Sequence, residues 1–428
     1  MRVVGNQSAV FGSRVRVVTT LAILLIAAER IALAETVFEV VATTSAGATD
    51  NALASPTGQA ETSDGFGIVS VGGRSLYRGA RSREMFGLQL MRTQYLVARA
   101  GDVTSGTLTL ASEINLNAAL DFTLGASAML SETTGIALGD PATVTPEAVL
   151  SAPHTYLASA VNQGLAYAPN TRHSYLELLS VSQVRYLGQS EALPTNTAVM
   201  GRLRANWSWV RDTLSIEATL TDSYLPFATP GAIGIFAQGT VLMPQLLLGW
   251  RRELSLRWSG ELQAGALALV NLDGKGVVAP AGRATLEYRD TAWFATLVAS
   301  QAPVANLYLG QATVSDQVLA RLSLPLDKRE LVILSGVGSY IFARLTDGQG
   351  NLTRGFTQWS AGPSLMVRFA HLPFLGAVEY TLTDQTGDDG TGGGVIPSLV
   401  RQTLMVTFGG TFAWGPGTPP LLHGSSEL

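Results

Sequence analysis

The chain contains no cysteine and little charge. Of its 428 residues, 46% are hydrophobic but only 14% are charged, against roughly 25% in typical soluble domains. The lack of cysteine excludes disulfides, thiolate catalysis, cysteine metal sites and a lipidated N-terminal cysteine. Lysine occurs only at Lys275 and Lys328, and no basic block favours nucleic-acid binding.

Long hydrophobic runs are also absent after the first 34 residues. A membrane-spanning helix needs about 20 consecutive apolar residues, and the rest of the chain offers none. The mean hydropathy is nevertheless +0.25. High overall hydrophobicity without continuous runs is typical of membrane-barrel strands, in which apolar and polar residues alternate.

Residues 1–34 have the features of a secretory signal peptide. Arginines precede an apolar core at 17–28, and Ala32-Leu33-Ala34 gives a small-x-small cleavage pattern. An uncleaved anchor helix is the alternative, but the core is short for a membrane span. We expect secretion and removal of this segment.

The remainder divides by composition into three parts. Residues 35–80 are rich in Ala, Thr, Ser, Gly and Asp, which predicts a flexible periplasmic segment. Phe66 to Val71 could instead form a first strand. Residues 81–414 carry the strand pattern, and the Pro/Gly-rich residues 415–428 are predicted to form a periplasmic tail.

Apolar and polar residues alternate with period two along 81–414. In the segment 254–270, Leu256 and Trp258 fall on one face, whereas Arg257 and Glu261 fall on the other. A strand separates two such sets, whereas a helix scatters them around its axis. Several segments reach 11 residues or more, long enough to cross a bilayer, whereas soluble strands average about 5–6.

Short and long connections alternate between these segments, as in outer-membrane barrels with short periplasmic turns and longer extracellular loops. The sequence therefore predicts an all-β fold: a transmembrane up-and-down antiparallel β-barrel of about 16 strands, with 14 and 18 as alternatives. The predicted strands span approximately 84–98, 104–115, 117–130, 154–167, 172–188, 196–210, 213–224, 240–251, 254–270, 282–289, 291–301, 313–325, 330–345, 354–369, 373–385 and 399–414.

The last predicted strand carries a more specific signal. Leu404, Val406, Phe408, Phe412 and Trp414 alternate with polar or small residues. This strand resembles the aromatic-ended C-terminal strand that the barrel-assembly machinery recognises in bacterial outer-membrane proteins. The resemblance implies a porin-like barrel in the outer membrane of a Gram-negative bacterium, in contact with that machinery and with outer-membrane lipids. Most members of this family end at the terminal aromatic residue, whereas here residues 415–428 follow Trp414.

A second resemblance concerns accessory barrels of exopolysaccharide export systems. The stretch 302–316 (APVANLYLGQATVSD) is similar to them, and its YLGQ tetrapeptide at 308–311 repeats that at 186–189. A coincidence at two strand ends explains the repeat as well. The resemblance implies an outer-membrane passage for polysaccharide and polysaccharide-export components as partners.

The sequence gives no basis for an enzyme, a metal site or a cofactor. Barrel phospholipases carry His two residues before Ser, and no His-x-Ser occurs here. His154 with Asp140 could mimic the Asp–His pair of barrel proteases, although a rim histidine is more often structural. Asp388 and Asp389 in a Gly-rich loop could bind calcium weakly. We therefore predict no catalytic residues, no metal and no cofactor.

The polar faces of the strands carry the candidate site. Charged side chains are costly in lipid, so these faces should point into the barrel. The predicted lumen-lining residues are Arg202, Arg204, Glu217, Arg257, Glu261, Arg283, Glu287, Arg321, Arg368, Glu379 and Arg401.

These residues favour a pore that passes polar solutes, with a mild preference for anions from the excess of arginine. If instead they pair with one another, they only brace the wall. A non-conducting structural or adhesive barrel is then the alternative function. A barrel hydrolase is the third.

The first prediction concerns location. We expect the protein in the outer-membrane fraction, migrating differently on unheated and heated denaturing gels because the barrel resists detergent until it is heated. A protein that stays in the soluble periplasm, without a heat-dependent shift, would contradict the barrel.

Overall fold

The computed structural model describes 18 strands and no helices in the residues it covers. Those residues are 35–52, 62–98, 102–133, 154–187, 195–225, 239–271, 274–290, 293–306, 311–327, 329, 331–346, 352–369, 372–387 and 398–414. The strands are β1 (Glu35–Thr49), β2 (Asp64–Arg78), β3 (Ser82–Tyr95), β4 (Val103–Asn117), β5 (Leu120–Thr133), β6 (His154–Asn170), β7 (His173–Leu187), β8 (Thr195–Ser208), β9 (Asp212–Leu225), β10 (Gly239–Glu253), β11 (Trp258–Asn271), β12 (Gly276–Arg289), β13 (Phe294–Asn306), β14 (Gln311–Pro325), β15 (Val332–Thr346), β16 (Leu352–Arg368), β17 (Phe374–Gly387) and β18 (Leu399–Trp414).

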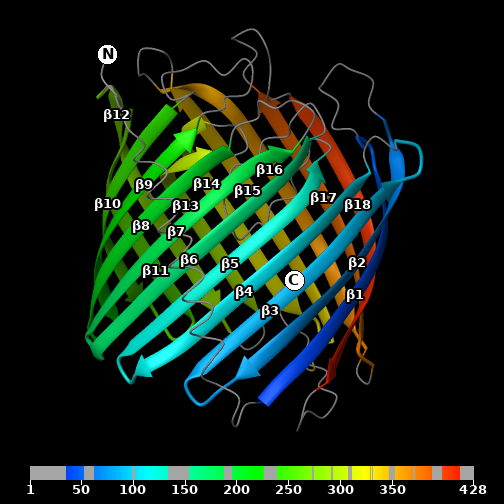
Figure 1. Ribbon diagram of the computed structural model, residues 1–428, viewed down its shortest axis with the longest axis horizontal. Helices are drawn as coiled ribbons and strands as arrows, with labels where there is room; N and C mark the ends of the chain where they lie inside the picture. Colours follow the sequence, from blue (N-terminus) through cyan, green and yellow to red (C-terminus); the bar gives the residue numbers. More distant parts are fainter. Residues whose placement is uncertain are drawn as a thin grey trace, which may run out of the picture.

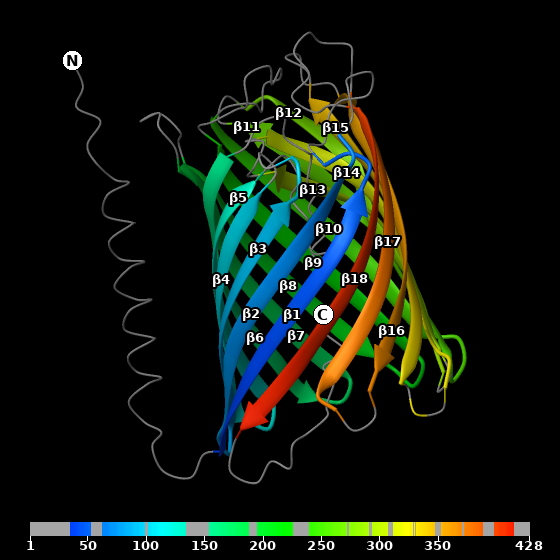
Figure 2. The ribbon, with the colours of Figure 1, turned by 90° about the vertical axis from the view of Figure 1, so that its right-hand side faces the viewer.

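The strands form one closed antiparallel barrel. Each strand pairs with its neighbour in the chain, and β1 pairs with β18 from Phe38↔Trp414 to Thr49↔Thr403. Figures 1 and 2 show the tilted strands surrounding a single interior. The up-and-down antiparallel prediction is confirmed, and the sixteen predicted segments correspond to β3–β18. The strand number is 18 rather than about 16.

The two additional strands correct the prediction of a flexible segment over 35–80. β1 and β2 pair along their full length, from Glu35↔Arg78 to Thr49↔Asp64. Their side chains are mostly small, so the composition resembles that of a linker. The backbone nevertheless finds hydrogen-bonding partners on both sides, and these pairings close the barrel. Residues 1–34 and 415–428, with the predicted signal peptide and tail, lie outside the described residues.

The outward face of the barrel is apolar. Leu203, Leu246, Leu248 and Leu262 point outward and are 51–62% exposed, which in a soluble protein would be a costly surface. In a bilayer the same side chains contact lipid. The closed ladder and this apolar exterior together give the architecture of a bacterial outer-membrane barrel.

Outward-facing aromatic residues mark the periplasmic boundary of this apolar face. The Trp258 and Tyr288 rings pack edge to face, with centroids 4.8 Å apart, and Trp250 Nε1 donates to Asp212 at 2.9 Å. Such amphipathic rings suit the membrane interface. The group comprises Tyr77, Tyr167, Tyr175, Trp207, Trp250, Trp258, Tyr288 and Trp414.

Two boundaries differ from the sequence prediction. Residues 254–257 form a turn rather than the start of a strand, because Ser255 Oγ accepts the backbone N–H groups of Arg257 and Trp258. Leu256 is therefore fully exposed in the turn, although its apolar side chain continues the alternation. Conversely, residues 276–281, which lie between the predicted strands 254–270 and 282–289, belong to β12.

A carboxylate organises the turn between β14 and β15. Asp327 accepts the backbone N–H groups of Val332 at 2.8 Å and Arg329 at 3.1 Å. The hydrogen bond from Val332 contributes most to lowering the pKa of the Asp327 carboxyl below its usual value. No helix in the described part of the chain is long and apolar enough to cross a bilayer.

The orientation of β10 gives a direct test of facing. Leu246 points to lipid and its neighbour Gln245 points inward. Leu246→Arg should cost about 2–4 kcal/mol near mid-membrane, whereas Gln245→Arg places the same charge in the lumen. We expect Leu246→Arg to lower the folded fraction on unheated gels and the urea midpoint. Equal effects of the two substitutions would contradict the register.

Candidate functional site: the barrel lumen

The register of the ladder assigns each side chain to one face, because directly paired residues in neighbouring strands point the same way. Seen from inside, the wall has two zones. Charged and polar residues lie in the half near the short turns, which is the periplasmic half in outer-membrane barrels. Apolar residues cluster near the opposite, extracellular ends of the strands.

Four of the predicted residues form one ion cluster on β8, β9 and β11. The Glu217 carboxylate lies 3.5 Å from Arg202 and 3.7 Å from Arg204. Arg204 also reaches Glu261 at 2.8 Å. Between β9 and β11, β10 presents Gly249, and the Ser215 and Gln263 side chains fill the space that a Cβ would take there. Two arginines and two glutamates thus balance each other and brace the wall.

Arg283 and Arg321 differ, because no carboxylate of the described residues lies within 4.0 Å of either guanidinium. Arg283 is exposed on the inward face of β12, opposite Gln263 and Ser300. Arg321 on β14 lies opposite Thr296 on β13, and its buried Nε lacks a hydrogen-bond partner among the described residues. Both positive charges therefore act on the lumen without local neutralisation.

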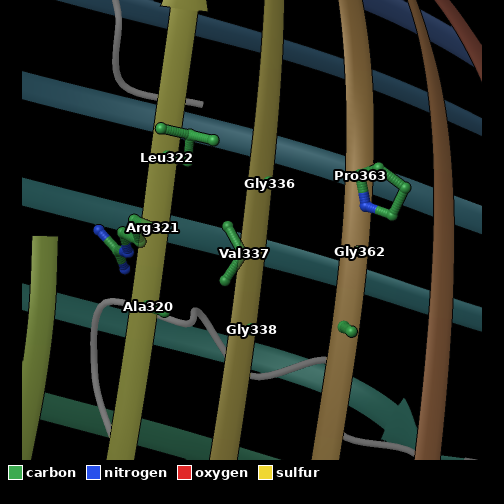
Figure 3. Close-up of a pocket in the computed structure, with 9 residues that line it drawn as sticks. Ala320, Arg321, Leu322, Gly336, Val337, Gly338, Gly362 and Pro363 are labelled. Atoms are coloured by element: carbon green, nitrogen blue, oxygen red, sulfur yellow. The ribbon is translucent and has the colours of Figure 1, made fainter. Parts of the chain in front are cut away.

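A hollow of about 310 Å³ adjoins Arg321 where β14, β15 and β16 run side by side (Figure 3). Gly336, Gly338 and Gly362 leave the wall without side chains there, and a Cβ at Gly336 would meet nothing within 4 Å. Among the described residues that line the hollow, Arg321 is the only ionisable one. Gly336 is paired with the outward-facing Leu322, so the hollow opens on the lipid side of the wall, whereas Arg321 faces the lumen.

The other predicted residues occupy several depths. Glu287 on β12 accepts a hydrogen bond from Ser259 at 3.3 Å, and Glu379 on β17 accepts one from Thr381 at 3.4 Å. Arg368 is the last residue of β16, at the periplasmic rim.

Two predicted residues lie away from the charged zone. Arg257 belongs to a periplasmic turn and pairs with Asp290 at 3.0 Å, so its prediction as a wall residue is wrong. Arg401 lies near the extracellular end of β18 and donates to Thr49 Oγ1 and Tyr95 OH, each at 3.1 Å.

One lumenal ion pair was not predicted. Arg74 on β2 donates to Glu39 on β1 across the paired strands, and both side chains point inward. The sequence analysis assigned both residues to a linker. The sequence offered only one sign of this pair: two oppositely charged residues, in segments where apolar and polar residues alternate weakly.

Three apolar clusters line the extracellular end of the lumen. The β1–β3 cluster comprises Ala52, Phe66, Tyr95 and Ala98. The β6–β9 cluster comprises Tyr156, Val184, Ala198 and Leu225. The β10–β14 cluster comprises Val241, Met243, Leu247, Leu267, Leu269, Ala279, Ala281, Ala312 and Val314.

The upper ends of β13 and β14, around Ala305 and Ala312, lie inside the barrel. By alternation Ala312 and Val314 belong to the outward face of β14, yet they are at most 2% exposed and pack on inward-facing residues such as Leu267. Ala305 packs against both the β10–β14 and the β6–β9 clusters. β14 keeps its pairing with β15 as far as Val314↔Arg344. The described residues beyond that pair, with the upper part of β13, therefore lie along the inner surface of the wall and narrow the extracellular mouth.

The candidates for other chemistry find little support. Among the described residues, no group of three or more His, Cys, Asp or Glu side chains could hold a metal ion. His154 begins β6, whereas Asp140, Asp388 and Asp389 lie outside the described residues. The predictions on enzyme chemistry and calcium thus stay predictions.

Comparison with known proteins finds no matching family and only distant structural neighbours. No protein-family model matches the sequence, and no curated protein is similar to it. Among solved structures, Pseudomonas aeruginosa OccK2 (OpdF) in complex with glucuronate is 11% identical, with a TM-score of 0.45 over 88% of this chain and 98% of its own. Acinetobacter baumannii OccAB3 is 10% identical, with a TM-score of 0.46 over 90% and 100%. The outer membrane protein opdK of Pseudomonas aeruginosa is 9% identical, with a TM-score of 0.45 over 89% and 99%. The function proposed below rests on this chain's own residues.

The position of the β13–β14 hairpin can be tested at Ala312, which is paired with Ala305 and lies beyond the last β14–β15 pair, Val314↔Arg344. A carboxylate buried among aliphatic side chains without a partner is strongly disfavoured, so Ala312→Asp should displace the hairpin from the inner wall. We expect a larger single-channel conductance in planar bilayers than for wild type or the control Ala312→Gly. An unchanged conductance in Ala312→Asp would mean that the hairpin does not narrow the passage.

Proposed function

We propose that this protein is an outer-membrane channel for small polar solutes, with a preference for anions. The observation that carries the proposal is the pair of inward-facing arginines, Arg283 and Arg321, that have no carboxylate partner among the described residues. A barrel of 16–18 strands is wide enough for a water-filled interior. The inward-folded hairpin then reduces its cross-section at the mouth.

The charge balance supports a moderate preference rather than strict selectivity. The cluster of Arg202, Arg204, Glu217 and Glu261 is internally neutral and adds little field beyond its own surroundings. Arg283 and Arg321 raise the potential where low-dielectric walls focus it. Salt at about 0.15 M screens that field over roughly 8 Å.

A closed, non-conducting barrel is the second candidate, favoured by the apolar clusters and the hairpin at the extracellular mouth. It predicts no conductance for wild type. Export of exopolysaccharide gains no support: the tetrapeptide at 308–311 lies almost wholly outside the described residues, and the narrowed mouth disfavours a bulky polymer.

Selectivity tests the proposal. The Arg283→Gln/Arg321→Gln double variant should lower the anion-to-cation permeability ratio by on the order of two-fold, because it removes two lumenal charges that no carboxylate neutralises. The measurement is the reversal potential in planar bilayers under a KCl gradient. The matched control is Arg257→Gln/Arg329→Gln, which removes two arginines from periplasmic turns. A cation-selective wild type, or equal effects of both double variants, would refute the assignment.

A further inference from the structure

In the described part of the wall, the ladder between β12 and β13 stops well short of the ends of both strands. The ladder between β12 and β13 ends at Gly282↔Gln301. Above this pair β13 continues with β14 as far as Asn306↔Gln311, and β12 continues with β11 as far as Gly276. No ladder therefore joins the upper parts of β12 and β13, residues 276–281 and 302–306, which we call the β12–β13 seam.

Two prolines explain where the ladder ends. If the register continued beyond Gly282↔Gln301, Pro280 would lie directly opposite Pro303. Each proline keeps its pairing on the other side, Pro280 with Ala266 and Pro303 with Val314. Both ring nitrogens therefore face the seam, and neither can donate a ladder hydrogen bond.

Other prolines in the wall show the effect of a single missing donor. At Pro244 the ladder to β11 skips two residues and then resumes, and at Pro363 the ladder to β17 does the same. In both places the pairing on the opposite side of the strand is continuous. One proline interrupts a ladder, whereas two facing prolines end it.

The seam opens at the height of the outer leaflet. Gly282 lies seven residues above Arg289, the periplasmic end of β12. At a rise of about 3.3 Å per residue and a tilt of about 40°, this is about 18 Å, within an apolar band of about 25 Å. Unpaired backbone at this depth is tolerated only where it borders protein or a cavity.

The surface beside the seam is apolar on both sides of β12. Val278 points outward and is 77% exposed, while its neighbours Val277 and Ala279 belong to the apolar surface inside. At a similar height, β3 and β17 present Arg92 and Asp384 outward instead. An apolar path thus leads from the lipid over the edge of β12 into the lumen.

A positive charge lies at the lower end of this path. Arg283 points into the lumen one residue below the last pair of the ladder, directly beneath Ala281. An apolar chain with a single anionic head matches this order, with the head on Arg283 and the chain along Ala281 and Ala279. Those alanines are at present covered by the hairpin residues Ala312 and Val314.

We propose that the β12–β13 seam is a lateral portal through which a single-chain anionic amphiphile passes between the lumen and the outer leaflet, displacing the β13–β14 hairpin. The portal requires a barrel embedded in a bilayer, but it does not require that the axial pathway conducts ions. The portal would give the protein a second, lateral route for amphiphiles that the polar lumen excludes.

Photolabelling tests the portal in protein reconstituted into phosphatidylcholine vesicles. The probe is dodecyl sulfonate with a diazirine at the end of the chain, a permanently charged amphiphile. A probe confined to lipid labels only outward-facing residues such as Val278. The portal predicts adducts on inward-facing Val277 and Ala279 as well, and fewer of them when the sulfonate head is replaced by a hydroxyl.

The matched variants restore backbone donors. Pro280→Val/Pro303→Val should close the seam and reduce the inward-facing adducts several-fold, while Pro363→Val restores a donor elsewhere and should leave them unchanged. Arg283→Gln should also reduce them, which keeps the test valid if the double variant folds poorly on unheated gels. Adducts confined to outward-facing residues in wild type, or inward-facing adducts insensitive to both changes, would overturn the portal.

The KCl conductance of the same samples separates this portal from the proposed channel. Normal conductance with no inward-facing adducts removes the portal and leaves the channel. Inward-facing adducts in a barrel that does not conduct retain the portal and remove the channel.

Discussion

The fold depends on one constraint: in lipid, every backbone N–H and C=O must find a partner within the protein. A strand satisfies only half of its groups with each neighbour, so an open sheet would expose two unpaired edges. Pairing of β1 with β18 removes both edges. This explains why residues 35–49, whose composition resembles a linker, form a strand. Their backbone completes the ladder, and their small side chains do not disturb its pairing.

The same constraint assigns the faces. Once the ladder is closed, alternation leaves one set of side chains in lipid and the other in the lumen. Charges then collect inside, where Glu217 and Glu261 neutralise Arg202 and Arg204 across three strands. Neutralisation stiffens the wall but weakens its field. The lumenal potential therefore depends on inward-facing arginines without such neighbours, such as Arg283 and Arg321, rather than on the number of arginines alone.

Alternation made β3–β18 predictable from the sequence, and with them the inward direction of most of the charged residues. It failed at Leu256, whose apolar side chain continues the period through a turn that Ser255 creates. It also could not reveal the inward hairpin. Ala312 and Val314 are apolar, as lipid-facing residues are. Aliphatic side chains inside the barrel and lipid outside it both favour apolar residues, so the sequence does not distinguish the two contacts. The period identifies the face of a strand, but not whether that face meets lipid or protein.

The signal for the hairpin lies in register rather than in hydrophobicity. A single proline interrupts the hydrogen-bonded ladder for two residues, as at Pro244 and Pro363. Pro280 and Pro303 fall opposite each other only once the β12–β13 pairing is known, so neither is informative alone. Together they withdraw both donors from one pair and release the upper part of β13 from the wall. The freed hairpin then buries its apolar face on the nearest apolar surface, which is the inner wall of β10–β12. Narrowing of the mouth and opening of the seam are thus two results of the same pair of missing hydrogen bonds.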